Sequence, residues 1–230
     1  MLLECQNIQF RYPGSDTLLF HDLHLAFDTP GFHALFGPSG VGKSSLAKII
    51  SGHLVPEGGV VRYNGTGRPL YGYNLERLPG WSSVGRHLDR VTPGHHRALK
   101  EKLVSAFDLE AIMDQHFSQL SLGQQNRINL LRYLVQDFDA LIMDESLANV
   151  DEKTRGHILL TIKTIFPDVL FLYISHNVVE VATFCRDIQV LRGTHKSPRV
   201  VKVQGLDCQS GAEVDRQLLQ DTMLEIMNAA

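Results

Sequence analysis

The sequence predicts an α/β fold with a mixed sheet, an antiparallel β layer and a small helical subdomain, arranged around a phosphate-binding loop. First, residues 37–44 match the phosphate-loop pattern G-x-x-x-x-G-K-[ST] without a gap. Second, two apolar runs, 140–143 and 169–174, have the length of buried parallel strands and are followed directly by polar side chains. Third, residues 84–113 mix charges with Leu and Ala at helical spacing, which indicates helices beside the sheet.

The amino-terminal part of the chain indicates the antiparallel layer. Residues 2–10 alternate loosely between apolar and polar and predict a strand, and turn residues follow at 11–16. We expect residues 18–27 to form a second and a third strand, closed by the turn residues 29–31. Tyr12 then lies at a loop tip, where its ring either stacks on an adenine face or is simply a partly exposed tyrosine.

The phosphate-binding loop lies between a predicted strand at 33–36 and a predicted helix at 45–50. Its glycines let the backbone curl so that successive N–H groups and the positive end of the helix dipole point at an anion. Lys43 is expected to reach the β- and γ-phosphates, and the Ser44 hydroxyl to coordinate a magnesium ion that bridges them. The residues expected to hold the phosphates are Gly37, Pro38, Ser39, Gly40, Val41, Gly42, Lys43, Ser44 and Ser45.

The region after the first helix is predicted to hold a turn, a strand, an irregular segment and then helices. Residues 60–65 are expected to form a hairpin strand, and residues 70–81 to be irregular. The helical segment that follows is interrupted by turn residues at 92–94. His95 and His96 come next, but adjacent residues on a helix point to different sides. We therefore interpret both as solvated surface residues rather than metal ligands.

The residues Leu-Ser-Leu-Gly-Gln at 120–124 predict the start of another helix. Ser121 is a good N-cap, and an apolar stripe follows over residues 128–135. The free N–H groups at a helix start can hold an anion. Taken alone, however, this stretch indicates only a capped helix.

Two predicted strands end in side chains that can take part in hydrolysis. The strand at 140–145 ends in Asp144 and Glu145, and the strand at 169–174 is followed by Ser175 and His176. Because strand ends in parallel α/β sheets face the ligand crevice, we expect these groups beside the phosphate loop. Asp144 can hold the magnesium shell, and Glu145 can accept a proton from an attacking water. Each feature alone also fits a solvated turn or a structural histidine.

Composition limits the classes of function. The chain has 230 residues, 43% of them hydrophobic, and a formal net charge of −3 with both signs interspersed, so it lacks the basic stripe of a dedicated nucleic-acid binder. Cys5, Cys185 and Cys208 are odd in number and widely spaced, which indicates free thiols in a reducing compartment. The amino terminus lacks the layout of a secretory signal, and the apolar runs are shorter than the ~20 residues that cross a bilayer. We expect a soluble chain that needs a partner for any membrane function.

The order and spacing of these motifs closely resemble the ATP-binding cassette (ABC) family, the nucleotide-hydrolysing subunits of ABC transporters, over nearly the whole chain. The correspondence is GPSGVGKSS with the Walker A loop, LSLGQQ with the family signature, ALIMDE with Walker B, residues 146–151 with the D-loop and residues 174–176 with the switch histidine. Tyr12 falls where this family places its adenine-stacking aromatic. The signature is diagnostic, because other phosphate-loop proteins lack it.

This resemblance implies a P-loop NTPase with the ABC ATPase fold: one domain over residues 1–230, with a helical signature subdomain at about 75–135 and a carboxyl-terminal tail at 193–230. It also implies ATP and Mg²⁺ as cofactors and a head-to-tail dimer, expected to be a homodimer, that sandwiches two ATP molecules. Each ATP would lie between the Walker A loop of one cassette and the signature of the other.

The resemblance also implies a role for each matching residue. Glu145, His176 and Lys43 are the expected catalytic residues. Ser44, Asp144 and Asn74 are the expected magnesium ligands. The nucleotide is expected to be bound, beyond the phosphate loop, by Tyr12, Asn74, Ser121, Gly123, Gln124 and Asp151, with Asp151 connecting the two sites.

Several positions depart from the family pattern. The family has a glutamine between Walker A and the helical subdomain, whereas this chain has no glutamine between Gln9 and Gln115. The best register, anchored on residues 78–81, places Asn74 at or near that position, and we expect it to act as a shorter substitute. Leu122 replaces the usual signature glycine, and residues 149–150 are Asn-Val where Ala-Leu is usual.

The partners implied are integral-membrane permease subunits, a second cassette and an extracytoplasmic solute-binding protein, with no nucleic acid expected. The expected location is cytoplasmic, peripheral on the inner face of the cell membrane. Small size and a separate polypeptide favour an importer of a small solute. The tail over residues 197–203, with a terminal helix at about 213–227, is similar to that of cassettes importing nitrate, sulfonates and taurine.

Three other functions are weighed against this interpretation. A non-transport ABC ATPase of DNA repair or translation usually carries tandem cassettes or a long coiled coil, and this chain shows neither an internal repeat nor a heptad run. A slowly hydrolysing dimerisation switch stays open because the family glutamine is missing. A small-molecule kinase is disfavoured by the signature helix.

Overall fold

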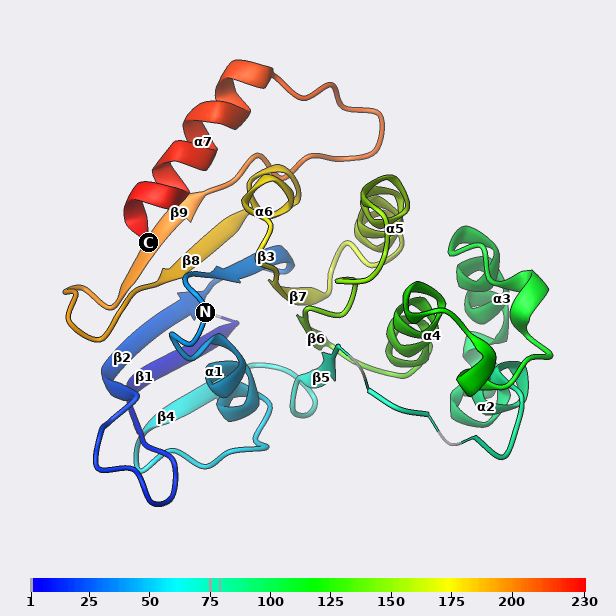
Figure 1. The fold of residues 1–230 in the computed structure, drawn as a ribbon, viewed down its shortest axis with the longest axis horizontal. Helices are drawn as coiled ribbons and strands as arrows, with labels where there is room; N and C mark the ends of the chain where they lie inside the picture. The colour runs from blue at the N-terminus through cyan, green and yellow to red at the C-terminus, as the bar shows by residue number, and fades with distance from the viewer. Residues whose placement is uncertain (1, 75, 79) are drawn as a thin grey trace.

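The structure is a computed structural model that describes residues 2–74, 76–78 and 80–230. It contains a six-stranded sheet in the order β5-β6-β7-β3-β8-β9 and a three-stranded sheet in the order β2-β1-β4 (Figure 1). The six strands are β3 (Gly31–Phe36), β5 (Leu70–Tyr73), β6 (Ala140–Asp144), β7 (Leu170–Ile174), β8 (Asp187–Leu191) and β9 (Val200–Gln204). All of these strand pairs are parallel except β8 with β9, so the mixed sheet is confirmed.

The antiparallel layer is also confirmed, with one correction. Its strands are β1 (Leu3–Phe10), β2 (Phe20–Phe27) and β4 (Gly58–Tyr63), all paired antiparallel. The expectation of two strands within residues 18–27 is wrong, because β2 pairs with β1 from Phe20 through Phe27. The pairing shifts register between Phe20 and Leu23, at a β-bulge where Asp22 has a φ of 52°.

The expectation that residues 70–81 are irregular is wrong at its start. Residues 70–73 form β5, whose partners run in register from Leu70 with Leu141 to Tyr73 with Asp144. A strand this short has no sequence period of its own, and it forms because β6 supplies a complete set of backbone partners. Leu75 and Pro79, which fall in the expected subdomain and in the register anchor, lie outside the described residues.

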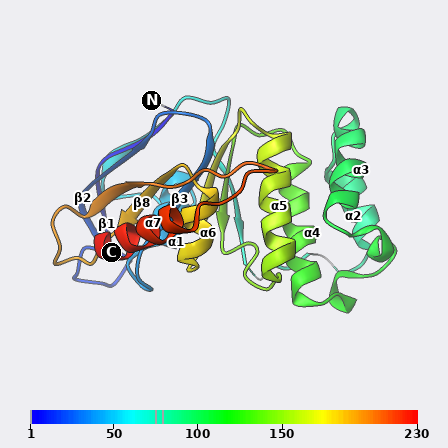
Figure 2. The same ribbon diagram turned by 90° about the horizontal axis from the view of Figure 1, so that it is seen from above.

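The helices form two groups. The helices α1 (Lys43–Ile50), α5 (Glu152–Ile165), α6 (Val178–Phe184) and α7 (Arg216–Ala229) pack against the sheets or against one another. The helices α2 (Val84–Val91), α3 (Arg97–Ala106) and α4 (Leu122–Leu134) lie at the opposite end of the molecule from the three-stranded sheet (Figures 1 and 2). Short 3₁₀ turns at Gly94–His96, Glu110–Ile112 and Phe117–Gln119 connect this second group.

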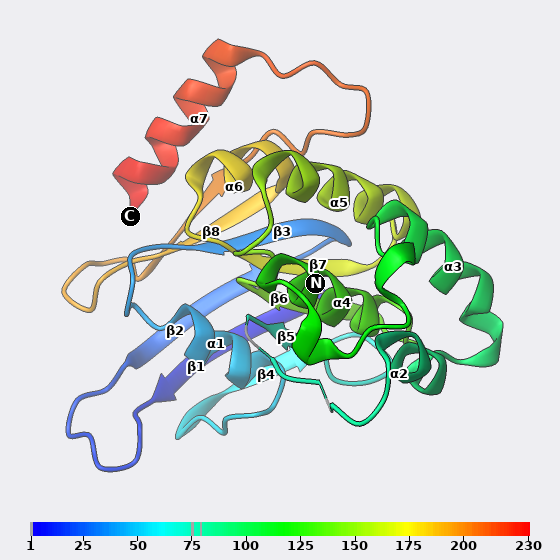
Figure 3. The ribbon, with the colours of Figure 1, turned by 45° about the vertical axis from the view of Figure 1, so that its right-hand side comes forward.

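Two hydrophobic cores share the six-stranded sheet. Along β6, Leu141 and Met143 belong to the core with α4, α5 and α6, whereas Ala140 and Ile142 belong to the core with α1 and the three-stranded sheet. In Figure 3, α5 and α6 lie above the six-stranded sheet and α1 lies below it. Both faces of the sheet are therefore covered, which explains the continuous apolar runs in its strands. Among the described residues, no helix is long and apolar enough to cross a membrane.

The order of the strands decides where the loops meet. Strands β6, β7 and β3 are neighbours and parallel, so their carboxyl ends lie along one edge of the sheet. The phosphate loop follows β3, Glu145 follows β6, and residues 175–176 follow β7. We therefore expect the nucleotide-binding site at this edge of the sheet.

Candidate nucleotide-binding site

The backbone of the phosphate loop requires glycine at two positions. Gly37 has a φ of 142°, and a Cβ there would lie 2.1 Å from the carbonyl oxygen of Leu191. Gly42 has a φ of 109°, and its Cβ would lie 2.7 Å from the ring of Phe20. Both glycines thus combine a left-handed conformation with close packing against β8 and β2. The loop is held in shape by the strands on either side of it.

The start of α1 is open to an anion. Gly42 is its N-cap, no side chain caps it, and no acidic residue lies in its first turn, so its leading N–H groups have no side-chain partner among the described residues. The buried ammonium of Lys43 donates to the carbonyls of Gly37 at 2.8 Å and Pro38 at 2.9 Å. Burial lowers the pKa of Lys43, and the nearby carboxylates of Glu145 and Asp144 oppose that shift.

Asp144 is buried at the end of β6 and is held by a residue that the sequence did not reveal. The hydroxyl of Tyr71, on the neighbouring strand β5, donates to Asp144 Oδ2 at 2.8 Å. Burial and the Asp144 carboxylate raise the pKa of Tyr71, so its hydroxyl stays a donor. A hydroxyl at Ser44 and a carboxylate at Asp144 are the hard oxygen donors that Mg²⁺ prefers, so these residues fit that ion.

Glu145 and His176 meet at the same edge. His176 Nε2 lies 2.5 Å from Glu145 Oε1, and the backbone N–H of Glu145 donates to Ile174 at 3.0 Å. Glu145 has a φ of 52°, a conformation that is uncommon outside glycine and that turns the chain sharply away from β6. Both side chains line a cavity of about 270 Å³ with the phosphate loop. Its lining residues are Tyr12, Leu19, Ser39, Gly40, Gly42, Lys43, Ser44, Ser45, Glu145 and His176.

Tyr12 reaches this cavity from the loop between β1 and β2. Its hydroxyl and Ser45 Oγ are 2.7 Å apart, and its ring stands edge-on to Phe10 with centroids 5.0 Å apart. Almost half of the residue, 45%, is exposed. Tyr12 therefore presents ring surface next to the phosphate loop while its hydroxyl is tied to α1.

Asn74 follows β5 directly and lies beside Asp144. Its backbone N–H donates to the Asp144 carbonyl at 3.0 Å. Its side-chain oxygen accepts from Asn126 of α4 and from Asn149, each at 3.2 Å. Asn74 thus connects the Walker B end of the sheet to α4 and to the loop after Glu145.

The remaining predicted residues, Ser121, Gly123, Gln124 and Asp151, do not line the cavity at the phosphate loop. Ser121 and Gln124 form a capping box at the start of α4, with Ser121 N donating to Gln124 Oε1 at 2.9 Å. Asp151 caps α5 by accepting from the Thr154 N–H at 2.9 Å, which lowers the pKa of Asp151. These groups form a second surface, apart from the first.

The second surface is exposed but closely fitted to the loop after Glu145. Leu122, in the position where the family has glycine, is 52% exposed. A Cβ added to Gly123 would lie 2.7 Å from the carbonyl oxygen of Asn149. Gly123 therefore permits the close approach of α4 to this loop.

A buried carboxylate, Glu180, supports the loop that carries the histidine, and sequence reasoning missed it. Its Oε1 accepts from Arg155 at 2.5 Å and from Asn177 at 2.9 Å. Its Oε2 accepts from Tyr173 at 2.9 Å and from Ser175 at 3.0 Å. The two residues that flank His176 are thereby fixed by one side chain.

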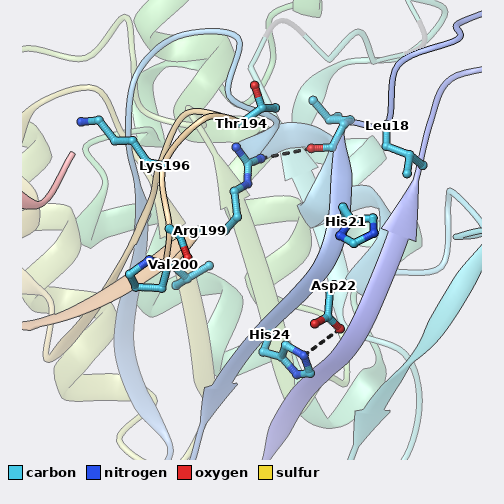
Figure 4. Close-up of a pocket in the computed structure, with 11 residues that line it drawn as sticks. Leu18, His21, Asp22, His24, Thr194, Lys196, Arg199 and Val200 are labelled. Carbon is cyan, nitrogen blue, oxygen red and sulfur yellow. Dashed lines mark hydrogen bonds and ion pairs between the residues drawn. The ribbon is translucent and has the colours of Figure 1, made fainter.

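The phosphate-loop cavity is smaller than another cavity of the molecule. A larger cavity of about 550 Å³ lies between β2 and the loop that joins β8 to β9 (Figure 4). Arg199 crosses it to donate to the Leu19 carbonyl at 3.1 Å, and His24 pairs with Asp22 at 3.1 Å. Among the described residues, Leu19 alone lines both this cavity and the phosphate-loop cavity. The nucleotide site is located by the chemistry of its groups, not by volume.

Three features together define a P-loop nucleoside triphosphatase. They are an anion-binding loop shaped by glycines with a buried lysine, a buried carboxylate at the end of β6, which is two strands away from β3, and a second carboxylate paired with a histidine. The sequence model of the ABC transporter family matches residues 20–148. The chain is 30% identical to the taurine import ATP-binding protein TauB of Pseudomonas putida over 207 residues, which cover 83% of this chain and 78% of that one. The chain belongs to the ABC transporter family and is an ATP-binding, ATP-hydrolysing cassette of it.

Other relatives and solved structures agree with this assignment. The chain is 30% identical to the molybdenum import ATP-binding protein ModC of Pseudomonas aeruginosa, covering 80% of this chain and 56% of that one. The fold is shared with an ATP-binding subunit of an ABC transporter, with a TM-score of 0.77, 20% identity and coverage of 99% and 100% of the two chains. A dimeric bacterial ABC transporter cassette gives a TM-score of 0.70 at 20% identity over 83% of this chain and 94% of that one.

Proposed function

We propose that this cassette powers the import of a small solute through a membrane permease, working as a head-to-tail dimer of two copies. The observation that carries the proposal is the division of its site into two surfaces. Tyr12, Lys43, Glu145 and His176 share one cavity, whereas the signature at the start of α4 lies outside it. A dimer that brings one surface against the other would complete each site.

In the proposed mechanism the adenine stacks on Tyr12, and the phosphates lie on the N–H groups of the loop and the start of α1. Mg²⁺, bound by Ser44 and Asp144 with help from Asn74, would neutralise charge on the β- and γ-phosphates. Tyr71 holds Asp144 in place for that role by its 2.8 Å hydrogen bond. When ATP binds, Lys43 gives up its hydrogen bonds to the two loop carbonyls and donates to phosphate oxygens instead.

Glu145 acts as the general base. It accepts a proton from the attacking water while the water oxygen bonds to the γ-phosphorus, and the bond to ADP breaks. His176, which lies 2.5 Å from Glu145, orients that carboxylate and holds the γ-phosphate. Ser121, Gly123 and Gln124 of the second copy complete the contacts to the γ-phosphate, and Asp151 connects the two sites.

The import direction is supported by two relatives, which are taurine and molybdenum import ATP-binding proteins. We propose a small anionic solute, an extracytoplasmic binding protein that delivers it, and a peripheral location of the cassette on the inner face of the membrane. In this scheme α2, α3 and α4 form a helical subdomain that carries the signature, and residues 193–230 form a tail whose α7 packs on α6 and β9.

The decisive experiment is a pull-down of the tagged Glu145→Gln protein from gently solubilised native membranes with ATP present. Because this change removes the base but leaves the binding surfaces, we expect a multi-span membrane protein to copurify and to reveal the substrate class. The matched control is Glu152→Gln, an exposed carboxylate on the first turn of α5. Recovery of only non-membrane proteins or nucleic acid would contradict the transporter role and favour the repair or translation alternative.

A further inference from the structure

A cluster of two histidines and one aspartate lies away from the nucleotide site. His95 and His96 belong to the 3₁₀ turn Gly94–His96 between α2 and α3, and Asp137 belongs to the loop between α4 and β6. The sequence led us to expect that adjacent histidines point to different sides. That expectation is wrong here, because a loop some forty residues later in the sequence brings one carboxylate to both rings.

The atoms of this cluster are arranged as metal ligands are. His95 Nε2 lies 2.9 Å and His96 Nε2 3.7 Å from Asp137 Oδ1. One ligand atom from each residue can be chosen so that all three lie within 4.8 Å of one another. A metal ion 2.0–2.2 Å from each of three such atoms fits within that separation after small side-chain rotations.

The protonation of His96 also suits a metal. Its Nδ1 lies 3.0 Å from the carbonyl oxygen of Val135, which can only accept, so Nδ1 carries the proton. Nε2 of the neutral ring then has its lone pair free on the side of Asp137. A backbone carbonyl that fixes the tautomer and orientation of a ligating histidine is the usual outer partner in protein metal sites.

We propose that His95, His96 and Asp137 form a binding site for a borderline divalent transition metal such as Zn²⁺. Two imidazoles and one carboxylate favour zinc, nickel, copper or cobalt over Mg²⁺ and Ca²⁺, which prefer oxygen ligands throughout. His95 is 63% and Asp137 68% exposed at the side chain, so the ion has an entry path and keeps coordination positions for water. The bound ion would join the start of α3 to the loop that leads into β6.

Without a metal, the same residues form an exposed histidine–aspartate pair, which contributes little to stability. The two cases make different predictions. A metal that binds only the folded chain stabilises it in proportion to the logarithm of its concentration, whereas a simple ion pair gives no response to metal.

The test uses the full chain, treated with EDTA, freed of any polyhistidine tag and without nucleotide. We expect Zn²⁺ alone to bind with one site per chain in isothermal titration calorimetry. At a hundredfold excess over its Kd it should raise the melting temperature by about 5–10 °C. Co²⁺ in place of Zn²⁺ should give visible d–d absorption that Zn²⁺ abolishes, and Mg²⁺ in excess should not compete.

Three variants locate the binding. His95→Ala, His96→Ala and Asp137→Asn are each expected to weaken Zn²⁺ binding by about tenfold or more, since loss of an outer partner alone costs that much. The matched control is His24→Ala, which removes another exposed histidine–aspartate pair, 3.1 Å apart, that does not belong to a three-residue metal-ligand cluster among the described residues. Binding that survives all three variants, or the absence of Zn²⁺ binding and of the melting shift in the parent, overturns the proposal.

Discussion

The phosphate-loop surface and the signature surface of this cassette are built in different ways. On the phosphate-loop side, Lys43 and Asp144 are both buried. Lys43 donates to two carbonyls of its own loop, and Asp144 accepts from Tyr71 on the neighbouring strand β5. On the signature side, Ser121 is held by the local capping box of α4, and Leu122 is 52% exposed. One chain therefore brings its phosphate loop, Glu145 and His176 to one cavity but presents its signature outside that cavity. This difference supports the proposal that a second copy supplies the signature for hydrolysis.

The largest expected effect comes from removing the base on the phosphate-loop side. Glu145→Gln keeps the shape of the side chain but cannot accept the proton, so steady-state ATP turnover should fall by about 10²–10⁴-fold. Nucleotide affinity, measured with a fluorescent ATP analogue, should stay within about twofold because Glu145 is not needed to hold the phosphates. Glu152→Gln serves as the control, and unchanged turnover in Glu145→Gln would remove Glu145 from the role.

Mixing two damaged chains tests the comparison directly. Lys43→Ala disables the phosphate-loop surface and Ser121→Ala disables the signature surface, so each homodimer should be nearly inactive. In a mixed dimer the intact signature of the first faces the intact phosphate loop of the second. If the sites act independently, an equal mixture should recover about a quarter of the parent turnover, because half of the dimers have one complete site. If the mixture is no more active than either variant alone, the ATP sites are not formed by the phosphate loop of one copy and the signature of the other.

Glu180, which fixes the two residues that flank His176, is expected to stabilise the fold. Glu180→Gln leaves the Arg155 guanidinium, on α5, without its buried counter-charge. Breaking such a pair costs about 3 kcal/mol, equivalent to a fall of about 6–12 °C in melting temperature for a chain of this size. The control is Glu225→Gln on α7, an exposed carboxylate that forms no ion pair with any described residue. It should change the melting temperature by less than about 2 °C. A melting temperature for Glu180→Gln equal to the parent's would show that the interactions of Glu180 do not contribute to the stability of the fold.

The smallest effect is expected at Asn74, which connects the two surfaces. Its side-chain oxygen accepts from both Asn126 and Asn149, so a magnesium role requires it to exchange at least one of these partners. Asn74→Gln adds one methylene and extends the amide toward the Walker B carboxylates. We expect ATP turnover at least equal to that of the parent, measured by phosphate release at saturating Mg²⁺-ATP. A large loss would show that Asn74 is required as a structural bridge and not as a shortened family glutamine.

The parts of the site that could be read from the sequence are those set by local rules. The phosphate loop, the N-cap at Ser121 and the strand ends at Asp144 and His176 each lie within a few residues of the pattern that predicts them. The features that the sequence did not predict depend on contacts between segments that are far apart in the chain. Strand β5 depends on pairing with β6, and Tyr71 meets Asp144 across that pair, 73 residues apart. No sequence period records such a contact.

The sequence by itself determined the fold class, because glycine conformation, helix capping and strand burial act over short stretches of chain. The order and spacing of its motifs determined the family. Only the tertiary structure decided how the groups of the site are held. It placed Tyr71 on Asp144, enclosed Glu180 among four donors and brought Asp137 to both His95 and His96. These contacts join segments far apart in sequence, and their geometry is fixed by the packing of the whole sheet and its helices.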